Sequence, residues 1–179
     1  MNTNILFRQN SKVILRPMEQ KDLPLLRRWI NNPEVSQYLT AYLPIDEFQE
    51  EEWLKSLGKR QPNDIVLGIV AKIKRPALIG NVGIHQISWK DRVATLGIFI
   101  GDCRFQNLGF GGETVNLICE YATTTLNLRK MCLSVHANNP RAIRCYEKCG
   151  FIREGVRKEQ MFIGGKYLDE IQMAKFLQS

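Results

Sequence analysis

Residues 101–113 read GDCRFQNLGFGGE and lie between an apolar segment with strand character and a segment with helical periodicity. Glycines let backbone N–H groups converge on an anion, and the N-terminus of a following helix adds partial positive charge. A tight turn from strand to helix would explain the glycines alone equally well. Two common phosphate motifs are excluded, because no Lys follows as in a P-loop and Thr114 replaces the third glycine of a dinucleotide fingerprint.

The segments on either side of this turn predict a mixed α/β domain. Apolar and alternating patterns predict strands at 12–18, 65–73, 78–88, 92–100, 130–137, 151–162 and 166–176. Helical spacing and capping signals predict helices at 21–31, 33–39, 47–57, from the glycine turn to about 126, and 139–149. Short connections make 65–100 an antiparallel meander, and 96–137 should be a right-handed crossover. The expected order is β-α-α-α-βββ-α-β-α-ββ, one domain over residues 1–179 with a mostly antiparallel sheet.

Composition restricts the classes of protein. The chain has five cysteines, an odd number, and no C-x-x-C pair occurs among them. We therefore expect neither a disulfide framework nor a metal site. No run of about 18 apolar residues and no signal-peptide pattern occurs, so no membrane association and a cytoplasmic location are expected. The net charge of +7 is scattered along the chain, so it requires no nucleic-acid partner.

Two motifs together resemble the GCN5-related N-acetyltransferase (GNAT) superfamily. The first is Gln106-x-x-Gly109-x-Gly111, and the second is Asn139-x-x-Ala142-x-x-x-Tyr146-x-x-x-Gly150-Phe151. The resemblance extends over nearly the whole chain. Residues 15–35 and 153–176 resemble a subgroup that acetylates ribosomal-protein N-termini, polyamines such as spermidine and diamines, and some antibiotics.

The resemblance implies a splayed sheet that holds acetyl-CoA between the strands expected at 92–100 and 130–137. It also implies that a backbone N–H in the first of these strands holds the acetyl carbonyl. The cofactor-binding residues that it implies are Ile98, Phe99, Ile100, Arg104, Gln106, Asn107, Leu108, Gly109, Phe110, Gly111, Gly112, Asn139, Ala142 and Tyr146.

Tyr146 is the catalytic residue that the resemblance implies, with its hydroxyl directed at the thioester sulfur. Asn139, Ala142 and Tyr146 share one helix face at their spacing. An ordinary Tyr has a pKa of about 10 and a thiol about 8.5, so full proton transfer to the thiolate would be uphill by roughly 2 kcal/mol. We therefore expect Tyr146 to stabilise the thiolate by a hydrogen bond.

The general base is left open by the sequence. Thr95 occupies a position where many relatives carry Glu, and it cannot act as a base near neutral pH. His85 and His136 are the two histidines of the chain, and each is more often a packed or surface residue than a base. A water relay, or an amine that is already partly neutral, would serve as well.

The acceptor amine is also left open. A missing carboxylate favours an amine of low pKa, such as a peptide N-terminus or an amino sugar, and the charge of +7 opposes a polycation. The acidic run at 46–52 could instead attract a polyamine or an aminoglycoside, and a CoA-binding module without turnover is a further alternative. A homodimer stays open as the oligomeric state. The candidate substrate residues are Trp29, Asn32, Glu34, Tyr38, His85, Trp89, Met161 and Tyr167.

Overall fold

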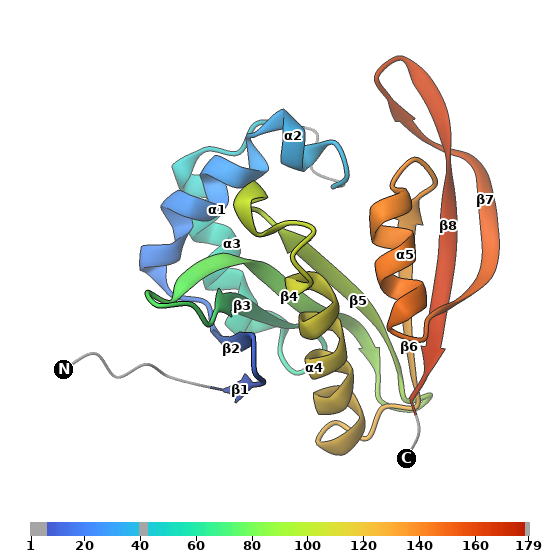
Figure 1. Ribbon diagram of the computed structural model, residues 1–179, viewed down its shortest axis with the longest axis horizontal. Coiled ribbons are helices and arrows are strands. Elements are labelled where there is room, and N and C mark those ends of the chain that lie inside the picture. The colour runs from blue at the N-terminus through green and yellow to red at the C-terminus, as the bar shows by residue number, and fades with distance from the viewer. Residues whose placement is uncertain (1–6, 40–42, 178–179) are drawn as a thin grey trace.

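The fold is built on one open, eight-stranded sheet. A computed structural model describes residues 7–39 and 43–177. The strand order is β1-β2-β3-β4-β5-β6-β8-β7, and every neighbouring pair is antiparallel except β5 and β6. The strands are β1 (Arg8–Gln9), β2 (Val13–Pro17), β3 (Ile65–Ala71), β4 (Ala77–Ser88), β5 (Val93–Ile100), β6 (Lys130–His136), β7 (Ile152–Ile163) and β8 (Lys166–Phe176). The mixed, mostly antiparallel class expected from the sequence is confirmed (Figure 1).

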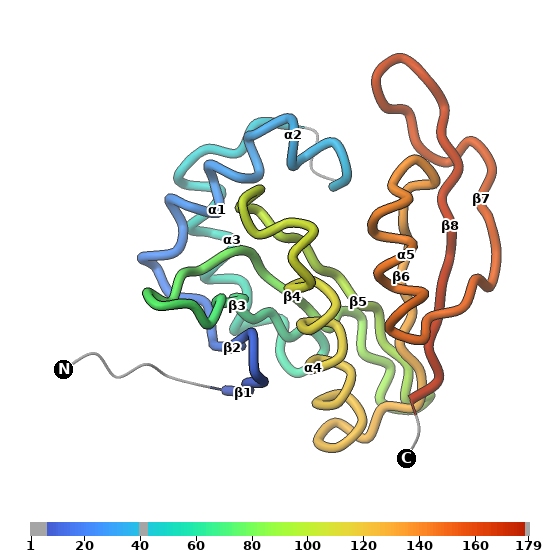
Figure 2. The backbone as a smooth tube through the Cα atoms, viewed as in Figure 1, coloured from blue at the N-terminus to red at the C-terminus, as the bar shows by residue number. Residues whose placement is uncertain are grey.

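The sheet splays between its two parallel strands. β5 and β6 pair through Val93–Thr95 and Lys130–Cys132, and no ladder pair between them is found further along among the residues described. Both strands continue beyond these pairs, to Ile100 and His136. They diverge toward the top of the molecule, as the backbone trace shows (Figure 2). The divergence opens a wedge between the two halves of the sheet.

Helices cover both faces of the sheet. They are η1 (Gln20–Asp22), α1 (Leu23–Ile30), α2 (Pro33–Ser36), α3 (Glu47–Arg60), η2 (Cys103–Phe105), α4 (Phe110–Thr124) and α5 (Pro140–Lys148). A smaller apolar cluster joins α1, α2 and α3 to Phe99 of β5. The larger cluster includes residues of α4 and α5 and reaches Ile98 and Ile100 on the other face of the same strand, as alternation along a strand requires.

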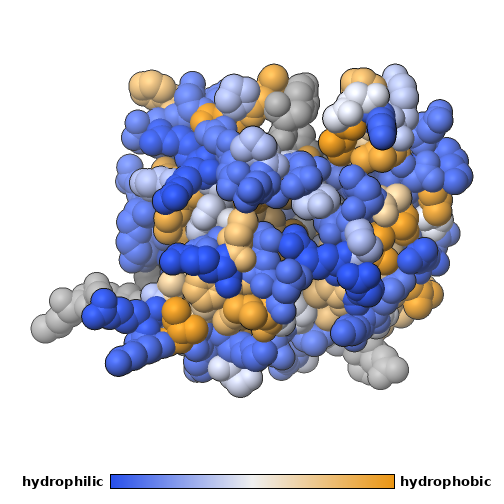
Figure 3. All heavy atoms as spheres, turned by 45° about the horizontal axis from the view of Figure 1, so that its top comes forward, coloured by the Kyte–Doolittle hydropathy of each residue, from blue (hydrophilic) through white to orange (hydrophobic). Residues whose placement is uncertain are grey.

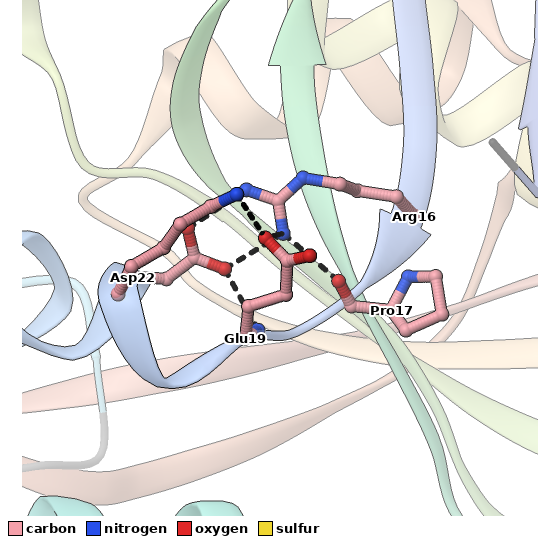
Figure 4. Close-up of polar contacts among 5 residues, drawn as sticks. Arg16, Pro17, Glu19 and Asp22 are labelled. Carbon is pink, nitrogen blue, oxygen red and sulfur yellow. Dashed lines mark hydrogen bonds and ion pairs between the residues drawn. The ribbon is translucent and has the colours of Figure 1, made fainter. Parts of the chain in front are cut away.

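A buried ion pair ties the first helices to the sheet. Arg16 of β2 donates to both carboxylate oxygens of Asp22, at 2.7 Å each, and Asp22 also accepts from the backbone N–H of Glu19 at 2.8 Å (Figure 4). The Asp22 side chain is 4% exposed. Hydrogen bonds with Asp22, followed by its negative charge, raise the pKa of Arg16, although burial opposes them. Because η1 leads directly into α1, this pair fixes where α1 starts.

The element boundaries differ from the prediction in a few places. The helix expected at 21–31 is split into η1 and α1, because Asp22 turns back to cap the backbone at Glu19. The helix expected to end at 57 continues to Arg60, since Gly58 sits in open space and basic residues complete its last turn. The sequence patterns also missed the two-residue β1 and the turn η2. Among the residues described, no helix is long and apolar enough to cross a bilayer.

Candidate active site

A cleft of about 680 Å³ lies at the divergence of β5 and β6. Its walls are α2, the end of β5, the loop into α4, the first turns of α4, the end of β6, α5 and one residue of β8. Figure 3, with the top of the molecule turned forward, shows mainly hydrophilic residues on this face with smaller hydrophobic patches among them. The cleft collects the sequence-predicted residues Glu34, Tyr38, Ile98, Phe99, Ile100, Gln106, Asn107, Gly109, Gly111, Gly112, Asn139, Ala142 and Tyr146.

The loop between β5 and α4 is held by its own side chains. Gln106 donates from Nε2 to the Ile100 carbonyl at 2.8 Å, and its Oε1 accepts from Arg141 of α5 at 2.6 Å. Gly109 has a φ of 88°, a left-handed conformation that favours glycine. Gln106 thus joins the loop to both walls of the wedge, and Gly109 is required by the turn itself.

Two other glycines are not explained by the fold. A Cβ atom at Gly111 or Gly112 would meet only the sulfurs of Cys145 and Cys149, at 3.8 to 3.9 Å, which is ordinary contact. At Gly80, in contrast, a Cβ atom would lie 2.0 Å from the Phe99 carbonyl oxygen. Gly111 and Gly112 line the cleft, so the first turn of α4, whose N–H groups have no partner within the helix, carries no side chain there, at positions where the fold would accept a methyl group.

This difference leads to a prediction for Gly111→Ala. The variant should keep or slightly raise its stability, because alanine is favoured over glycine inside a helix by about 1 kcal/mol. The affinity for CoA should fall by about 10- to 100-fold, because the added methyl group would keep the phosphate away from backbone N–H groups whose hydrogen bonds to it contribute roughly 1.5–3 kcal/mol. Calorimetric titration with CoA measures the affinity and thermal unfolding measures the stability.

Gly58→Ala is the matched control for Gly111→Ala. Gly58 lies inside α3, and nothing lies within 4 Å of the position that its Cβ would take. It should gain stability in the same way and bind CoA as the wild type does. Unchanged CoA affinity in Gly111→Ala would exclude this turn as the phosphate site.

Basic side chains line the wall of the cleft formed by α5. Arg141, Arg144 and Lys148 are three and seven residues apart, so they share one helix face, and all three line the cleft. Lys12 adds its amino group beside the loop, 3.3 Å from the Leu108 carbonyl oxygen. Together with the α4 N-terminus they form a site suited to a polyanion. The sequence interpretation missed all four, although the spacing on α5 was a visible signal.

Asn139 has a structural function in α5. Its Oδ1 accepts from the backbone N–H of Ala142 at 3.1 Å, so the side chain caps the helix. The residue is 9% exposed and borders the cleft. The cap fixes the direction of α5, which carries Tyr146 two turns later.

Tyr146 faces the cleft from α5. Its ring packs at a tilt of 57° on Phe151, with the ring centroids 5.9 Å apart. Burial first, and then the neighbouring Cys145 and Cys149, raise the pKa of the phenol above its ordinary value of 10.0. The side chain is therefore a neutral hydrogen-bond donor rather than a proton-releasing acid.

The two histidines lie in different environments. His136, at the end of β6, is 6% exposed and lines the cleft. His85 of β4 lies outside the cleft lining, with Nδ1 3.6 Å from the Asp64 carboxylate and its ring over Gly83 and Gly97. Burial, the largest effect, lowers the pKa of both imidazoles. Thr95 pairs with His85 across β4 and β5 and is likewise outside the lining.

Several predicted residues are placed away from the cleft. Trp29 is buried in the α1–α3 cluster, Asn32 caps α2, and Trp89 donates to Asn63 at 3.1 Å. Met161 and Tyr167 lie in the β7–β8 hairpin. On the cofactor side, Arg104 pairs with Asp102, Leu108 is exposed to solvent, and Phe110 packs against Phe105 in the core. None of these eight residues belongs to the lining found for the described residues.

The model of the acetyltransferase (GNAT) domain family matches residues 12–152. The chain belongs to this family. Among curated relatives, the spermidine N(1)-acetyltransferase of Vibrio cholerae is 34% identical over 92% of each chain. That of Escherichia coli K12 is 30% identical over 92% of this chain and 86% of its own. The L-amino acid N-acetyltransferase AaaT of Escherichia coli K12 is 27% identical over 92% of this chain and 98% of its own.

A solved GNAT structure also resembles this one closely. The crystal structure of the Vibrio cholerae spermidine N-acetyltransferase in complex with CoA and spermine has a TM-score of 0.83 and 32% identity. The alignment covers 94% of this chain and 97% of that one. This GNAT protein is thus an N-acetyltransferase that uses acetyl-CoA. The cationic wall and the open turn of α4 in its cleft fit a cofactor rich in phosphate.

Proposed function

We propose that the protein acetylates a terminal primary amine of a polyamine-like cation. The observation that carries this proposal is a pair of carboxylates on opposite sides of the cleft. Glu34 comes from α2 and Glu170 from β8, and both line the cleft together with Tyr38 (Figure 1). A chain of ammonium groups would pass between them on its way to the acetyl group.

The net charge of +7 does not decide against a cation. The Debye length is about 8 Å at physiological ionic strength, so exposed charges further away than this are largely screened. The charges that line the cleft therefore determine whether a cation is attracted to it. Glu170 is held by Arg157 at 3.1 Å, which offsets part of its charge, whereas Glu34 is exposed and lies at the N-terminus of α2.

The cleft residues divide into two groups in this proposal. Arg141, Arg144 and the first turn of α4 bind the phosphates of the cofactor, which supplies an activated acetyl thioester when bound. Tyr146 donates a hydrogen bond to the sulfur as negative charge develops on it. Glu34 and Glu170 orient the acceptor so that one amine reaches the divergence of β5 and β6.

Two spermidine N(1)-acetyltransferases among the relatives support this acceptor class. A peptide or amino-acid α-amine is the second candidate. Thr95 favours it, because an α-amine with a pKa of about 8 is partly neutral without a nearby carboxylate. The 27% identity to an L-amino acid N-acetyltransferase agrees with it.

A thiol-release assay across an amine panel tests the proposal. The panel contains spermidine, spermine, putrescine, an amino sugar, L-amino acids and a short peptide with a free N-terminus. We expect spermidine or spermine to give the highest kcat/KM. A higher kcat/KM with the peptide or the amino acids would favour the second candidate, and CoA binding without release for every amine would leave a non-catalytic module.

Glu34→Gln supplies a second measurement on the same assay. Loss of one exposed carboxylate should raise the KM for spermidine by about two- to fivefold, because an exposed ion pair contributes up to about 1 kcal/mol. The KM for acetyl-CoA should stay the same. Glu120→Gln, which removes an exposed carboxylate of α4 that is not part of the cleft lining, is the matched control.

A further inference from the structure

His136 presents a buried polar atom that the fold does not explain. The residue is 6% exposed, and its Nδ1 has no hydrogen-bond partner. Leaving a buried donor or acceptor unpaired is energetically costly, so such atoms are few in native proteins. Because the same side chain lines the cleft, a ligand-directed role accounts for the cost.

The strand places His136 on the acceptor side of the sheet. Met131, Leu133 and Val135 of β6 belong to the larger core cluster, so the alternate residues Ser134 and His136 project to the opposite face. This is the face that carries α2. The cleft therefore passes through the divergence, from Tyr146 on α5 on one side to His136 on the other.

The groups around the imidazole keep it neutral at physiological pH. Burial has the largest effect and lowers the pKa of His136 below its ordinary value of 6.5, while the Glu170 charge and the Gln37 carbonyl oppose this in part. Glu170 lies directly opposite on β8 and is itself paired with Arg157 of β7. The other titratable groups that line the cleft are Glu34 of α2, Tyr38 just after it, Glu113 of α4, and Arg141, Arg144, Cys145, Tyr146, Lys148 and Cys149 on and just after α5.

We propose that His136 is the general base that receives the proton of the acceptor amine. As the neutral amine forms its C–N bond with the acetyl carbon, the C–S bond breaks and the electron pair leaves with sulfur. The proton passes from nitrogen to a ring nitrogen of His136 and then to solvent, and the thiolate accepts a hydrogen bond from Tyr146 before it is protonated. The proposal rests on acetyl transfer to an amine and is independent of the acceptor class.

The test is the ratio of kcat/KM between the wild type and His136→Gln, measured from about pH 5 to pH 9 with the best acceptor of the panel. Above the pKa of His136 the ratio should be constant, at about 10² or more, as general-base catalysis typically contributes. Below that pKa it should fall by about tenfold per pH unit, because the protonated imidazole cannot accept a proton. Any effect of the amine's own ionisation cancels in the ratio.

An NMR titration of His136 gives an independent measure of the pH at which the activity ratio should fall. The chain has two histidines, so His85→Gln leaves a single imidazole to follow by NMR titration. The midpoint for His136 should lie below 6.5 and should coincide with the pH at which the activity ratio falls. His85→Gln should also keep the pH profile of the wild type, because His85 lies outside the cleft lining.

A folding defect is separated from a chemical one by two further measurements. His136→Gln should bind CoA as the wild type does in calorimetry, and added imidazole should restore activity to His136→Ala. An activity ratio that is independent of pH would overturn the proposal. So would an NMR midpoint of His136 that differs from the pH at which the activity ratio falls. Failure of spermidine as an acceptor would count against the proposed acceptor class alone, since the ratio is measured with whichever amine is acetylated.

Discussion

Tyr146→Phe is expected to lower kcat by about 10²- to 10³-fold, the effect typical of removing one donor from a site of developing negative charge. The buried phenol stays protonated across the physiological range, because burial raises its pKa. It can therefore stabilise the leaving thiolate by a hydrogen bond without giving up its proton. The ring would keep its contact with Phe151, so the KM for acetyl-CoA should change by less than about threefold.

Steady-state kinetics with the acetyl-CoA concentration varied measures both parameters. Tyr121→Phe is the matched control, since Tyr121 is a tyrosine of α4 that packs on Phe7 and is not part of the cleft lining. It should leave kcat and KM near their wild-type values. Equal changes of kcat and KM in Tyr146→Phe would mean that the hydroxyl only positions acetyl-CoA.

Asp22→Ala is expected to lower the free energy of unfolding by about 3–5 kcal/mol, the usual effect of breaking a buried ion pair by removing one partner. The substitution removes two 2.7 Å hydrogen bonds from Arg16 and the backbone bond at Glu19. Arg16, 12% exposed at its side chain, would keep its hydrogen bond to the Pro17 carbonyl at 2.9 Å and the weaker contact with Glu19 at 3.6 Å. Urea denaturation measures the change.

Lys21→Ala is the control that separates the effect of breaking a buried ion pair from the effect of breaking an exposed one. Lys21 also pairs with Glu19, but its side chain is 71% exposed, so the loss should stay within about 0.5 kcal/mol. A similarly small loss of unfolding free energy for Asp22→Ala would mean that η1 and α1 are held by apolar packing alone. Asp22→Asn keeps one hydrogen-bond acceptor, so its loss of unfolding free energy should lie between those of Asp22→Ala and Lys21→Ala.

Sequence periodicity identified nearly every helix and strand, because the apolar residues repeat at the spacing of the element that buries them. The exceptions depend on long-range contacts. β1 has two residues, and its position is set by pairing with β2 rather than by its own pattern. The break between η1 and α1 depends on Arg16, which lies on a strand outside the predicted helix.

The cofactor side of the cleft was easier to predict than the acceptor side. Its residues come from two continuous motifs, and the structure brings Gln106, Gly111 and Tyr146 to one cleft as expected. The acceptor side is assembled from segments far apart in sequence. Glu170 reaches His136 only through the β6–β8 register, so no local pattern could have distinguished His136 from His85.

The divergence of β5 and β6 has a consequence for how such an enzyme can be redesigned. Apart from Lys12, the cofactor wall is encoded between residues 97 and 149, whereas the proposed acceptor contacts at Glu34 and Glu170 lie outside this segment on either side. The two specificities therefore occupy separable stretches of the gene. Exchange of the segments that carry Glu34 and Glu170 should change the amine preference. The central segment would stay the same, so the affinity for acetyl-CoA should be retained.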